Sequence, residues 1–482
     1  MELRAHSDLT RRRRVGILLI CCLSLFIVGI DITVVNIALP TIGDQLGSGI
    51  TGLQWTVDAY TVVMASLLML SGSMADRLGR KRIFMLGLSV FSAASLLCSV
   101  APSVGLLVAF RVLQAVGASM MNPVAMSIIT NTFTDPRERA QAVGVWGAVF
   151  GISMALGPIV GGAMVSPLGW RAIFVVNVPI GLAAIALTLR FIPESRAPRP
   201  RRFDPVGQSA VLILMASLTF AIIQAPTSGW TSPEVVGALV AAVGALAVVL
   251  RYEPRRAEPL IDLRFFASAP FSASIVIAIA AFAAFGGFLF LTTLYLQDVR
   301  DLSPAAAGLT TLPLALMIII ISPISGWLVG RRGPRLPLAV SGLGTIAASA
   351  MLAGIGADTS TAWLLVAYTV FGIGFGFVNA PITNAAVSGM PREQAGVASA
   401  VATTSRQFGQ TLGVAVIGAI VASPHSADLA SASHPAWWTL SALGGIVLAL
   451  GFLATSTRAK ASAHRTAAQL NPDALAALVT TR

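Results

Sequence analysis

Long apolar runs separated by short polar breaks follow one another along almost the whole chain. A hydrocarbon core roughly 30 Å thick is crossed by a helix of about 20 apolar residues, and runs of this kind recur fourteen times. We number these predicted transmembrane helices 1 to 14. The first seven span residues 15–39, 54–73, 83–100, 104–129, 141–165, 171–192 and 208–226. The other seven span residues 233–252, 270–296, 304–329, 336–356, 361–386, 395–421 and 436–456.

The pattern predicts an all-α polytopic membrane protein, and the composition agrees. Of the 482 residues, 56% are hydrophobic and 11% are charged, with a mean hydropathy of +0.82. A typical soluble domain carries about 25% charged residues. This composition excludes a soluble globular domain.

The formal net charge of +12 is compatible with nucleic-acid binding until each basic residue is placed on the helix map. Nearly all of the 32 Lys and Arg residues fall at the termini or in the even-numbered loops, whereas Arg171 and Arg300 fall on the other side. This is the positive-inside bias, and it predicts that both termini are cytoplasmic. The charge therefore reports topology, and no nucleic-acid partner is expected.

The arginines at 11–14, before the first apolar run, resemble the start of a secretory signal. No small-residue cleavage site follows and thirteen more spans do, so we expect an uncleaved first helix. The cysteines lie inside predicted spans as small apolar packing residues, and the histidines lie in the tails or the last outer loop. No metal or cofactor site is predicted from them. These residues are Cys21, Cys22, Cys98, His6, His425, His434 and His464.

Weak internal repetition divides the chain into two halves. LLVAF recurs as LLVAY, GSMADRLGRK as GWLVGRRGPR, and RAQA as REQA. These pairs align helices 2, 4 and 5 with helices 10, 12 and 13, which leaves helices 7 and 8 over. We expect an N-terminal six-helix bundle at 1–192, a linker with two inserted helices at 193–265, a C-terminal six-helix bundle at 266–456 and a cytoplasmic tail at 457–482.

Five motifs then carry a family resemblance. GSMADRLGRKR, after helix 2, resembles the loop motif of the major facilitator superfamily, and FRVLQAVGAS in helix 4 resembles its second motif. GIDITVVNIALP in helix 1, GPIVGG in helix 5 and WRAIFVVNVPIG in helix 6 resemble the fourteen-helix drug:proton antiporter branch. The resemblance implies the major facilitator fold, with two six-helix bundles plus two inserted helices.

The loop motif has both a structural and a functional interpretation. The glycine that ends helix 2 permits close packing, and the aspartate can accept from the N-terminal end of a neighbouring helix. By resemblance the loop is a conformational latch between the bundles, while the alternative is a solvated charged turn. The motif residues are Gly72, Asp76, Arg77, Gly79 and Arg80.

The helix 5 motif predicts close packing and a bend. Gly157 and Gly161 are four residues apart and share a helix face, and Pro158 removes a backbone donor. Ordinary small-residue packing is the alternative; the resemblance implies an antiporter. The matching residues are Gly144, Gly157, Pro158, Gly161 and Gly162, and Ser153 stands where the family pattern has glycine.

Four charged residues fall inside predicted spans, where each costs about 2.5–3.5 kcal/mol at mid-membrane. Asp31, Asp58 and Arg111 are our candidates for proton coupling, against the alternative of a salt bridge that only holds helices together. For Arg406 the two interpretations stay open. A carboxylate in an apolar cavity favours its neutral form, a nearby cation favours the charged form, and a substrate that shifts this balance can expel a proton.

Helices 9 to 14 contain no acid, so coupling is expected in the N-terminal half. Polar side chains among apolar and aromatic ones suit a large, partly apolar substrate held by few polar contacts. The candidates for the substrate cavity are Asn36, Tyr60, Gln114, Tyr295, Gln297, Asn379 and Asn384.

The leading hypothesis is a monomeric, proton-coupled exporter of hydrophobic or amphipathic compounds such as antibiotics, in the bacterial inner membrane, without a cofactor. Its partners are then the substrate, protons and the lipid bilayer. One alternative is an importer or uniporter of a metabolite on the same fold. Another is a membrane enzyme or sensor, against which stand the missing catalytic constellations and the lack of a sizeable soluble domain.

Overall fold

The computed structural model describes residues 10–196, 204–256, 259–388, 390, 395–422 and 429–470. Within these ranges all regular elements are helices and there is no strand, as the hydropathy pattern predicts. The helices of the first half are α1 (Arg11–Leu46), α2 (Ile50–Leu78), α3 (Arg80–Ser99), α4 (Val104–Thr132), α5 (Pro136–Leu168), α6 (Ala172–Val175), α7 (Asn177–Phe191), α8 (Pro205–Ser228) and α9 (Pro233–Tyr252).

Three short helical turns follow α9, precede α10 (Ala269–Leu294) and follow α10. They are η2 (Glu253–Arg255), η3 (Leu263–Ala267) and η4 (Tyr295–Val299). The longer helices of the second half are α10 (Ala269–Leu294), α11 (Pro304–Thr310), α12 (Leu312–Arg332), α13 (Arg335–Leu352), α14 (Thr361–Gly376), α15 (Asn379–Val387), α16 (Ala395–Val421), α17 (Leu429–Ala454) and α18 (Thr457–Leu470).

In the described part of the chain, 12 helices are long and apolar enough to cross a membrane, or up to 13 if the two bent halves of α5 form one span. The expected helix 13 corresponds to α16, which is 27 residues long but has the polar middle TTSRQFGQT. The count of fourteen therefore stays a prediction.

One expected feature lies in a different element, and others lie outside the described residues. The last apolar helix, α17, begins at Leu429, so His434 lies within it and not in an outer loop. Residues 197–203 and 257–258 of the expected linker, 391–394 of the REQA repeat and 471–482 of the expected tail lie outside the described residues.

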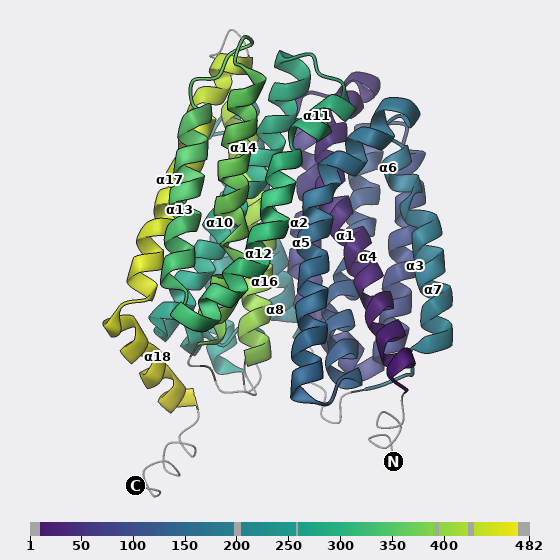
Figure 1. Ribbon diagram of the computed structural model, residues 1–482, viewed down its shortest axis with the longest axis vertical. Coiled ribbons are helices and arrows are strands. Elements are labelled where there is room, and N and C mark those ends of the chain that lie inside the picture. Colours follow the sequence, from purple (N-terminus) through teal and green to yellow (C-terminus); the bar gives the residue numbers. More distant parts are fainter. Residues whose placement is uncertain are drawn as a thin grey trace, which may run out of the picture.

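The helices form two sets that stand side by side (Figure 1). In the first set α1 packs against α4, α5 and α7, and α4 packs against α2 and α3. In the second, α10 packs against α16 and α17, and α13 against α14 and α17. The start of α1 and the whole of α18 lie at one end of the molecule (Figure 1). We call this the inner end and the opposite one the outer end; the positive-inside rule predicts that the inner end is cytoplasmic.

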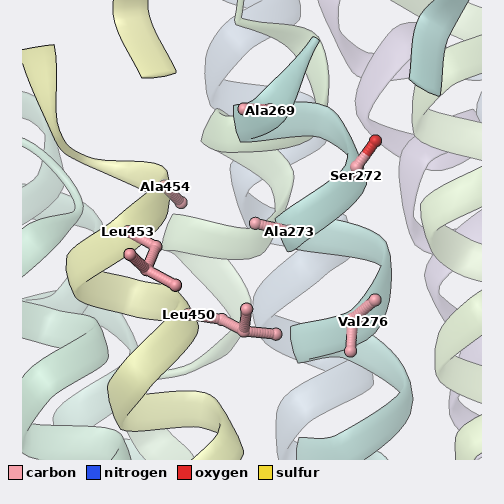
Figure 2. A pocket seen from close by; sticks show the side chains of 7 residues that line it. All are labelled: Ala269, Ser272, Ala273, Val276, Leu450, Leu453 and Ala454. Carbon is pink, nitrogen blue, oxygen red and sulfur yellow. The ribbon is translucent and has the colours of Figure 1, made fainter. Parts of the chain in front are cut away.

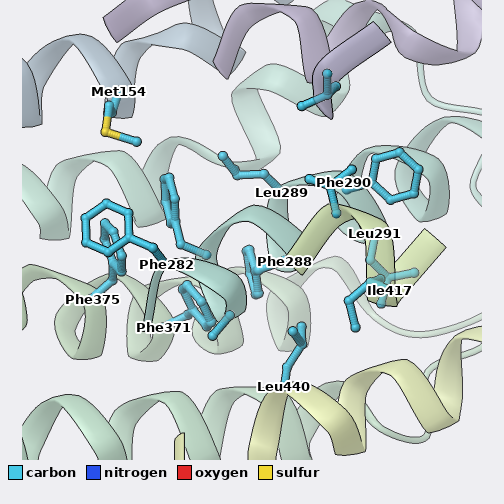
Figure 3. Packing of buried hydrophobic residues seen from close by; sticks show 14 of the residues in the cluster. Met154, Phe282, Phe288, Leu289, Phe290, Leu291, Phe371, Phe375, Ile417 and Leu440 are labelled. Carbon is cyan, nitrogen blue, oxygen red and sulfur yellow. The ribbon is translucent and has the colours of Figure 1, made fainter. Parts of the chain in front are cut away.

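Helix α10 is the centre of the second set, and 89% of its most apolar window is buried. Its aromatic side chains stack on those of α14: the Phe288 and Phe371 ring centroids are 3.9 Å apart, and those of Phe285 and Phe375 are 4.1 Å apart. Figure 3 shows Phe288 between Phe371 and Leu440 of α17. Burial on all sides explains why α10 is apolar around its whole circumference.

Helix α8 lies where the two sets meet, in contact with both α2 and α16. The Gln208 amide donates to the Ser66 carbonyl of α2. Met215 packs in a cluster with Val62 of α2 and Phe408 of α16. The first of the two helices expected as an insert thus touches both sets.

Candidate functional site

A buried polar network surrounds Asp31 in the middle of α1. One Asp31 carboxylate oxygen accepts from Arg111 Nη1 of α4 at 2.5 Å. The other accepts from Gln114 Nε2 at 2.9 Å and from Asn177 Nδ2 of α7 at 3.1 Å. Gln114 Nε2 also donates to Ser95 Oγ of α3 at 2.8 Å. The network therefore joins four helices of the first set through one carboxylate.

The Arg111 guanidinium has further partners besides Asp31. Its Nε donates to the Thr56 carbonyl of α2 at 3.1 Å, and its Nη1 also reaches Gln114 Oε1 at 2.7 Å. The guanidinium carbon lies 4.0 Å from the centre of the Tyr60 ring, a cation–π distance. Both charged side chains are fully buried, so their mutual pairing and these hydrogen bonds replace the lost water.

Asp58 is buried just as completely but lacks such partners. Neither of its carboxylate oxygens has a hydrogen-bond partner among the described residues. Gln54 and Thr61 lie one turn away on the same face of α2, by helical spacing. Gln54 Nε2 donates to the Ala415 carbonyl of α16 at 2.9 Å, and Thr61 Oγ1 accepts from Thr411 Oγ1 at 2.6 Å. Asp58 therefore lies on the face of α2 that meets the second set.

Helix α16 adds polar groups to this seam. Gln407 and Gln410 are buried at 5% and 1% exposure and share a face with Thr411. The Gln407 Oε1 atom and both polar side-chain atoms of Gln410 have no hydrogen-bond partner in the described part of the chain. We call the buried residues of this seam the α2–α16 polar strip: Gln54, Asp58, Thr61, Gln407, Gln410 and Thr411.

The helix 5 motif packs α5 tightly onto α1, close to Asp31. A Cβ atom on Gly157 would collide with the Thr33 side chain and lie 3.0 Å from the Val34 nitrogen, and one on Gly161 would collide with Ile37. The two glycines thus share one face, as predicted from their spacing. Close packing at these positions requires glycine, and it fixes α5 against the turns of α1 that follow Asp31.

Another face of α5 meets the second set. A Cβ on Gly162 would strike the Pro304 carbonyl at the start of α11, and one on Gly308 would strike the Pro158 carbonyl. Nothing lies within 4 Å of a Cβ on Gly144, so that member of the motif has no packing reason to be glycine here.

Helix α5 also bends, by 43° between 141–154 and 156–168. The bend follows from Pro158, which cannot donate to the carbonyl of Met154 one turn earlier. The predicted bend is therefore present, about one turn before the expected proline.

The loop motif differs from expectation at Gly72. The nearest atom to a Cβ on Gly72 would be Pro123 Cβ at 3.8 Å, an ordinary contact, so the expected close packing is wrong for this arrangement. The Asp76 carboxylate accepts from Arg80 Nη2 at 3.0 Å and Nε at 3.2 Å. Arg80 is the first residue of α3, so the donor at the start of this neighbouring helix is a guanidinium. Arg77 is exposed.

Gly79 connects α2 to α3 with φ +115°, a backbone conformation that favours glycine. A Cβ there would lie 2.6 Å from a carboxylate oxygen of Glu194, which follows α7. Glu194 accepts from the Lys81 amide at 3.1 Å and lies 3.7 Å from Arg82 Nε. The loop is thus held to the inner end of the first set by a carboxylate that the motif does not include.

Two pockets in the described part of the chain, one between α10 and α17 and one near Asp298 and His434, are not lined by any of the expected substrate-cavity residues. Tyr295 Oη donates to the Gly356 carbonyl at 2.7 Å, and Gln297 Nε2 donates to the Ile37 carbonyl of α1 at 2.8 Å. These two side chains connect separate segments of the chain by hydrogen bonds.

The other cavity candidates divide by burial. Asn36 is 2% exposed and its Oδ1 has no partner among the described residues, as is also true of the Tyr60 hydroxyl. Asn379 is half-buried at the start of α15, and Asn384 is exposed. Arg406 donates from Nη2 to Thr383 Oγ1 at 2.6 Å.

Arg406 also bears on the salt-bridge interpretation. The ion pairs found among the described residues do not include it. The structural alternative, a pair that only holds helices together, therefore gains no support for this residue.

Several site residues are missing from the sequence-based set: Asn177, Ser95, Gln54, Gln407, Gln410 and Glu194. The first five are polar side chains within apolar helices, and Asn177 lies in the helix 6 motif WRAIFVVNVPIG. Burial cost alone could have marked these five. Glu194 lies in a loop, where a charged residue is unremarkable, so no sequence signal distinguishes it.

Comparisons with known proteins agree with this architecture. The chain is 36% identical over 407 residues to the multidrug resistance protein Stp of Mycobacterium tuberculosis, covering 84% of this chain and 76% of the relative. The identity and coverage are the same for the tetracenomycin C resistance and export protein of Streptomyces glaucescens. The multidrug efflux pump LfrA of Mycolicibacterium smegmatis is 35% identical over 407 residues, covering 84% of this chain and 80% of the relative.

Solved structures share the fold at lower identity. A peptide transporter POT in complex with sulfate superposes with a TM-score of 0.68 and 16% identity, covering 93% of this chain and 95% of the other. A bacterial homologue of the lysosomal transporter Spinster, inward-facing and unoccupied, gives a TM-score of 0.65 and 18% identity, covering 95% and 99%. Residues 21–414 match the Major Facilitator Superfamily. With its apolar helices, its two packed sets and these relatives, the chain is a multi-pass membrane protein, in bacteria of the inner membrane, and belongs to the Major Facilitator Superfamily.

Proposed function

We propose that this chain is a proton-coupled antiporter that exports hydrophobic or amphipathic small molecules, antibiotics among them, by alternating access. The names of the relatives support the direction and the substrate class, because they are called resistance, export and efflux proteins. The observation that carries the coupling is the contrast between two buried carboxylates. Asp31 is neutralised by Arg111 within the first set, whereas Asp58 is unpartnered where the two sets meet.

The two carboxylates have different roles in this proposal. An unpaired buried ion costs several kcal/mol even after relaxation, so Asp58 must be neutralised whenever the α2–α16 polar strip is closed. Either a proton or a cationic group of the substrate can do this, and the two therefore compete. Asp31 and Arg111 keep their pairing and transmit the state of α2 to α1, α4 and α7 through the shared network.

Alternating access follows if the two sets separate along this strip. The moving bodies are the expected bundles at 1–192 and 266–456, joined by 193–265, with the tail at 457–482 outside both. The loop around Gly79, fixed to the first set by Glu194, is then a latch at the inner end. Inward movement of one proton charge through 100 mV supplies about 2.3 kcal/mol for export. A monomer contains all of these parts.

The substrate is found first with a toxicity panel in a host that lacks its own pumps. The coupling is then measured in inside-out vesicles, with a fluorescent pH indicator that reports proton release when a protective compound is added. Wild type should release protons and Asp58→Asn should not, because an amide cannot exchange a proton. Asp44→Asn is the matched control, since Asp44 is exposed at the outer end of α1.

Two outcomes would overturn the proposal. Proton release by Asp58→Asn at the wild-type rate would show that this carboxylate is not the exchange site. The export hypothesis would also be rejected if the wild type protected the host against no compound and no compound drove proton release. Import of a metabolite would then be the favoured function.

A further inference from the structure

An apolar groove of about 300 Å³ lies between α10 and α17 at the inner end. Figure 2 shows its walls: Ala269, Ser272, Ala273 and Val276 on α10, and Leu450, Leu453 and Ala454 on α17. Val276 is 45% exposed and Leu453 is 64% exposed. On a helix that spans a membrane, such side chains face lipid. The groove therefore opens toward the bilayer, at the level of the leaflet beside the inner end.

Helix α18 lies against the inner mouth of this groove. Its Ser462 Oγ accepts from the Ala269 amide, in the groove wall, at 2.9 Å. Its small residues Ala459, Ala463 and Thr466 are buried, and the helix packs against α10 and η3. The groove thus continues directly into the surface of an amphipathic helix.

That surface is basic. The sequence of α18, TRAKASAHRTAAQL, contains two arginines and a lysine and no acidic residue. Arg458 and Arg465 are exposed and lie four and three residues from Ser462, which places them on the same flank of the helix as the groove contact. Lys460 and His464 are exposed on the opposite flank.

A further cation lies near the inner end of α17, on the face of that helix away from the groove. The Arg335 guanidinium is 5.1 Å from the ring centre of Phe452, which is 44% exposed on α17 next to Leu453. Exposed apolar side chains here are thus bordered by arginines at the inner end. This is the arrangement in which an acyl chain and an anionic headgroup meet their complements together.

We propose that the groove between α10 and α17 and the arginine flank of α18 bind one anionic glycerophospholipid of the adjacent leaflet. One acyl chain lies along the groove against Val276 and Leu453. The headgroup phosphate lies at Arg458 and Arg465, where guanidinium groups can pair with phosphate oxygens in a bidentate manner. A zwitterionic lipid would fill the groove equally well but would gain less from the two arginines.

The purified full chain in detergent tests this by native mass spectrometry, with phosphatidylglycerol and phosphatidylcholine of identical acyl chains. Wild type should bind phosphatidylglycerol more tightly. Arg458→Gln should weaken phosphatidylglycerol binding about fivefold, the effect of about 1 kcal/mol per basic residue near an anionic lipid. Binding of phosphatidylcholine should weaken less than that of phosphatidylglycerol in this variant, and Val276→Trp should weaken the binding of both lipids because it fills the groove.

Two matched variants separate a defined site from general attraction. Lys460→Gln removes the same charge on the opposite flank, and Val240→Trp makes the same change at a 66% exposed valine of α9. Both should bind lipid as wild type does. The proposal fails if wild type binds the two lipids equally, if Lys460→Gln loses as much as Arg458→Gln, or if Val276→Trp changes nothing.

Discussion

At the scale of single residues, the decisive quantity is whether a buried charge has partners. Asp31 accepts three hydrogen bonds, one of them from the Arg111 guanidinium, and Arg111 also bonds the Thr56 carbonyl. Asp58 has no partner among the described residues although it is equally buried. Two aspartates in neighbouring helices thus have opposite electrostatic surroundings. One stabilises an arrangement of helices, and the other requires a ligand or a proton.

The Asp31–Arg111 pair makes a prediction about stability. Asp31→Asn should lower the free energy of unfolding of the purified chain by about 3–5 kcal/mol, because it leaves Arg111 charged and without a counter-ion in the membrane interior. The double variant Asp31→Asn with Arg111→Gln should recover part of the loss, since it removes the stranded charge as well. Thermal unfolding in detergent, analysed as a double-mutant cycle, measures the coupling. Additive effects of the two substitutions would contradict the pairing.

At the scale of elements, α5 connects the site to the second set. One of its faces fits α1 so closely that only glycine is tolerated at 157 and 161, and another meets the start of α11 at Gly162. Pro158 lies between these contacts, next to the 43° bend. A change in the bend would therefore move the contact with α11 relative to the contact with α1. The antiporter motif therefore connects the contact between α5 and α1 with the contact between α5 and α11.

Substitutions at two glycines of the motif should show whether transport depends on the close contact between α5 and α1. Gly157→Leu should give a chain that inserts but does not transport, because the side chain would displace α1 at Thr33, two residues after Asp31. Gly144→Leu is the matched control: it adds the same side chain to the same helix where space is open. Membrane levels and transport of the identified compound are the measurements. Equal transport by the two variants would show that the close packing at Gly157 is not needed for transport.

At the scale of the whole molecule, the position of the contacts between the two helix sets shows which end of the transporter is closed. Four hydrogen bonds that join the sets lie at mid-height or toward the outer end; their donors are Gln54, Thr411, Gln297 and Ala305. Helix α8 covers the α2–α16 seam from the side. The outer ends are thus closed, and export requires them to part.

A reversible cross-link at the outer end tests that movement. The Ala305 amide donates to Ser166 Oγ at 3.0 Å, which brings α11 and α5 together. Ser166→Cys with Ala305→Cys should form a disulfide or accept a short thiol cross-linker, stop transport, and recover with reductant. Each single cysteine variant is the control, and the native Cys21, Cys22 and Cys98 are buried. Transport at the wild-type rate by the cross-linked chain would show that this end does not need to open.

The sequence by itself determined the features that depend on local chemistry. Every predicted span is occupied by helix, because apolar length and backbone hydrogen bonding act within one segment. The cost of charge in the membrane marked Asp31, Asp58 and Arg111 as exceptional, and the spacing of Gly157 and Gly161 predicted their common face. The family resemblance and the bend at Pro158 were also readable from the chain.

Only the tertiary structure decided which exceptional residues meet. Asp31 and Arg111 are 80 residues apart, so their pairing depends on how α1 and α4 pack, and the same holds for the isolation of Asp58 beside α16. Tyr295 and Gln297 donate to backbone carbonyls, and Asp76 pairs with the side chain of Arg80, the first residue of α3. The physical reason is common to all of them: hydropathy and helix formation are properties of a segment, whereas the partner of a buried polar atom is set by helix contacts distant in sequence.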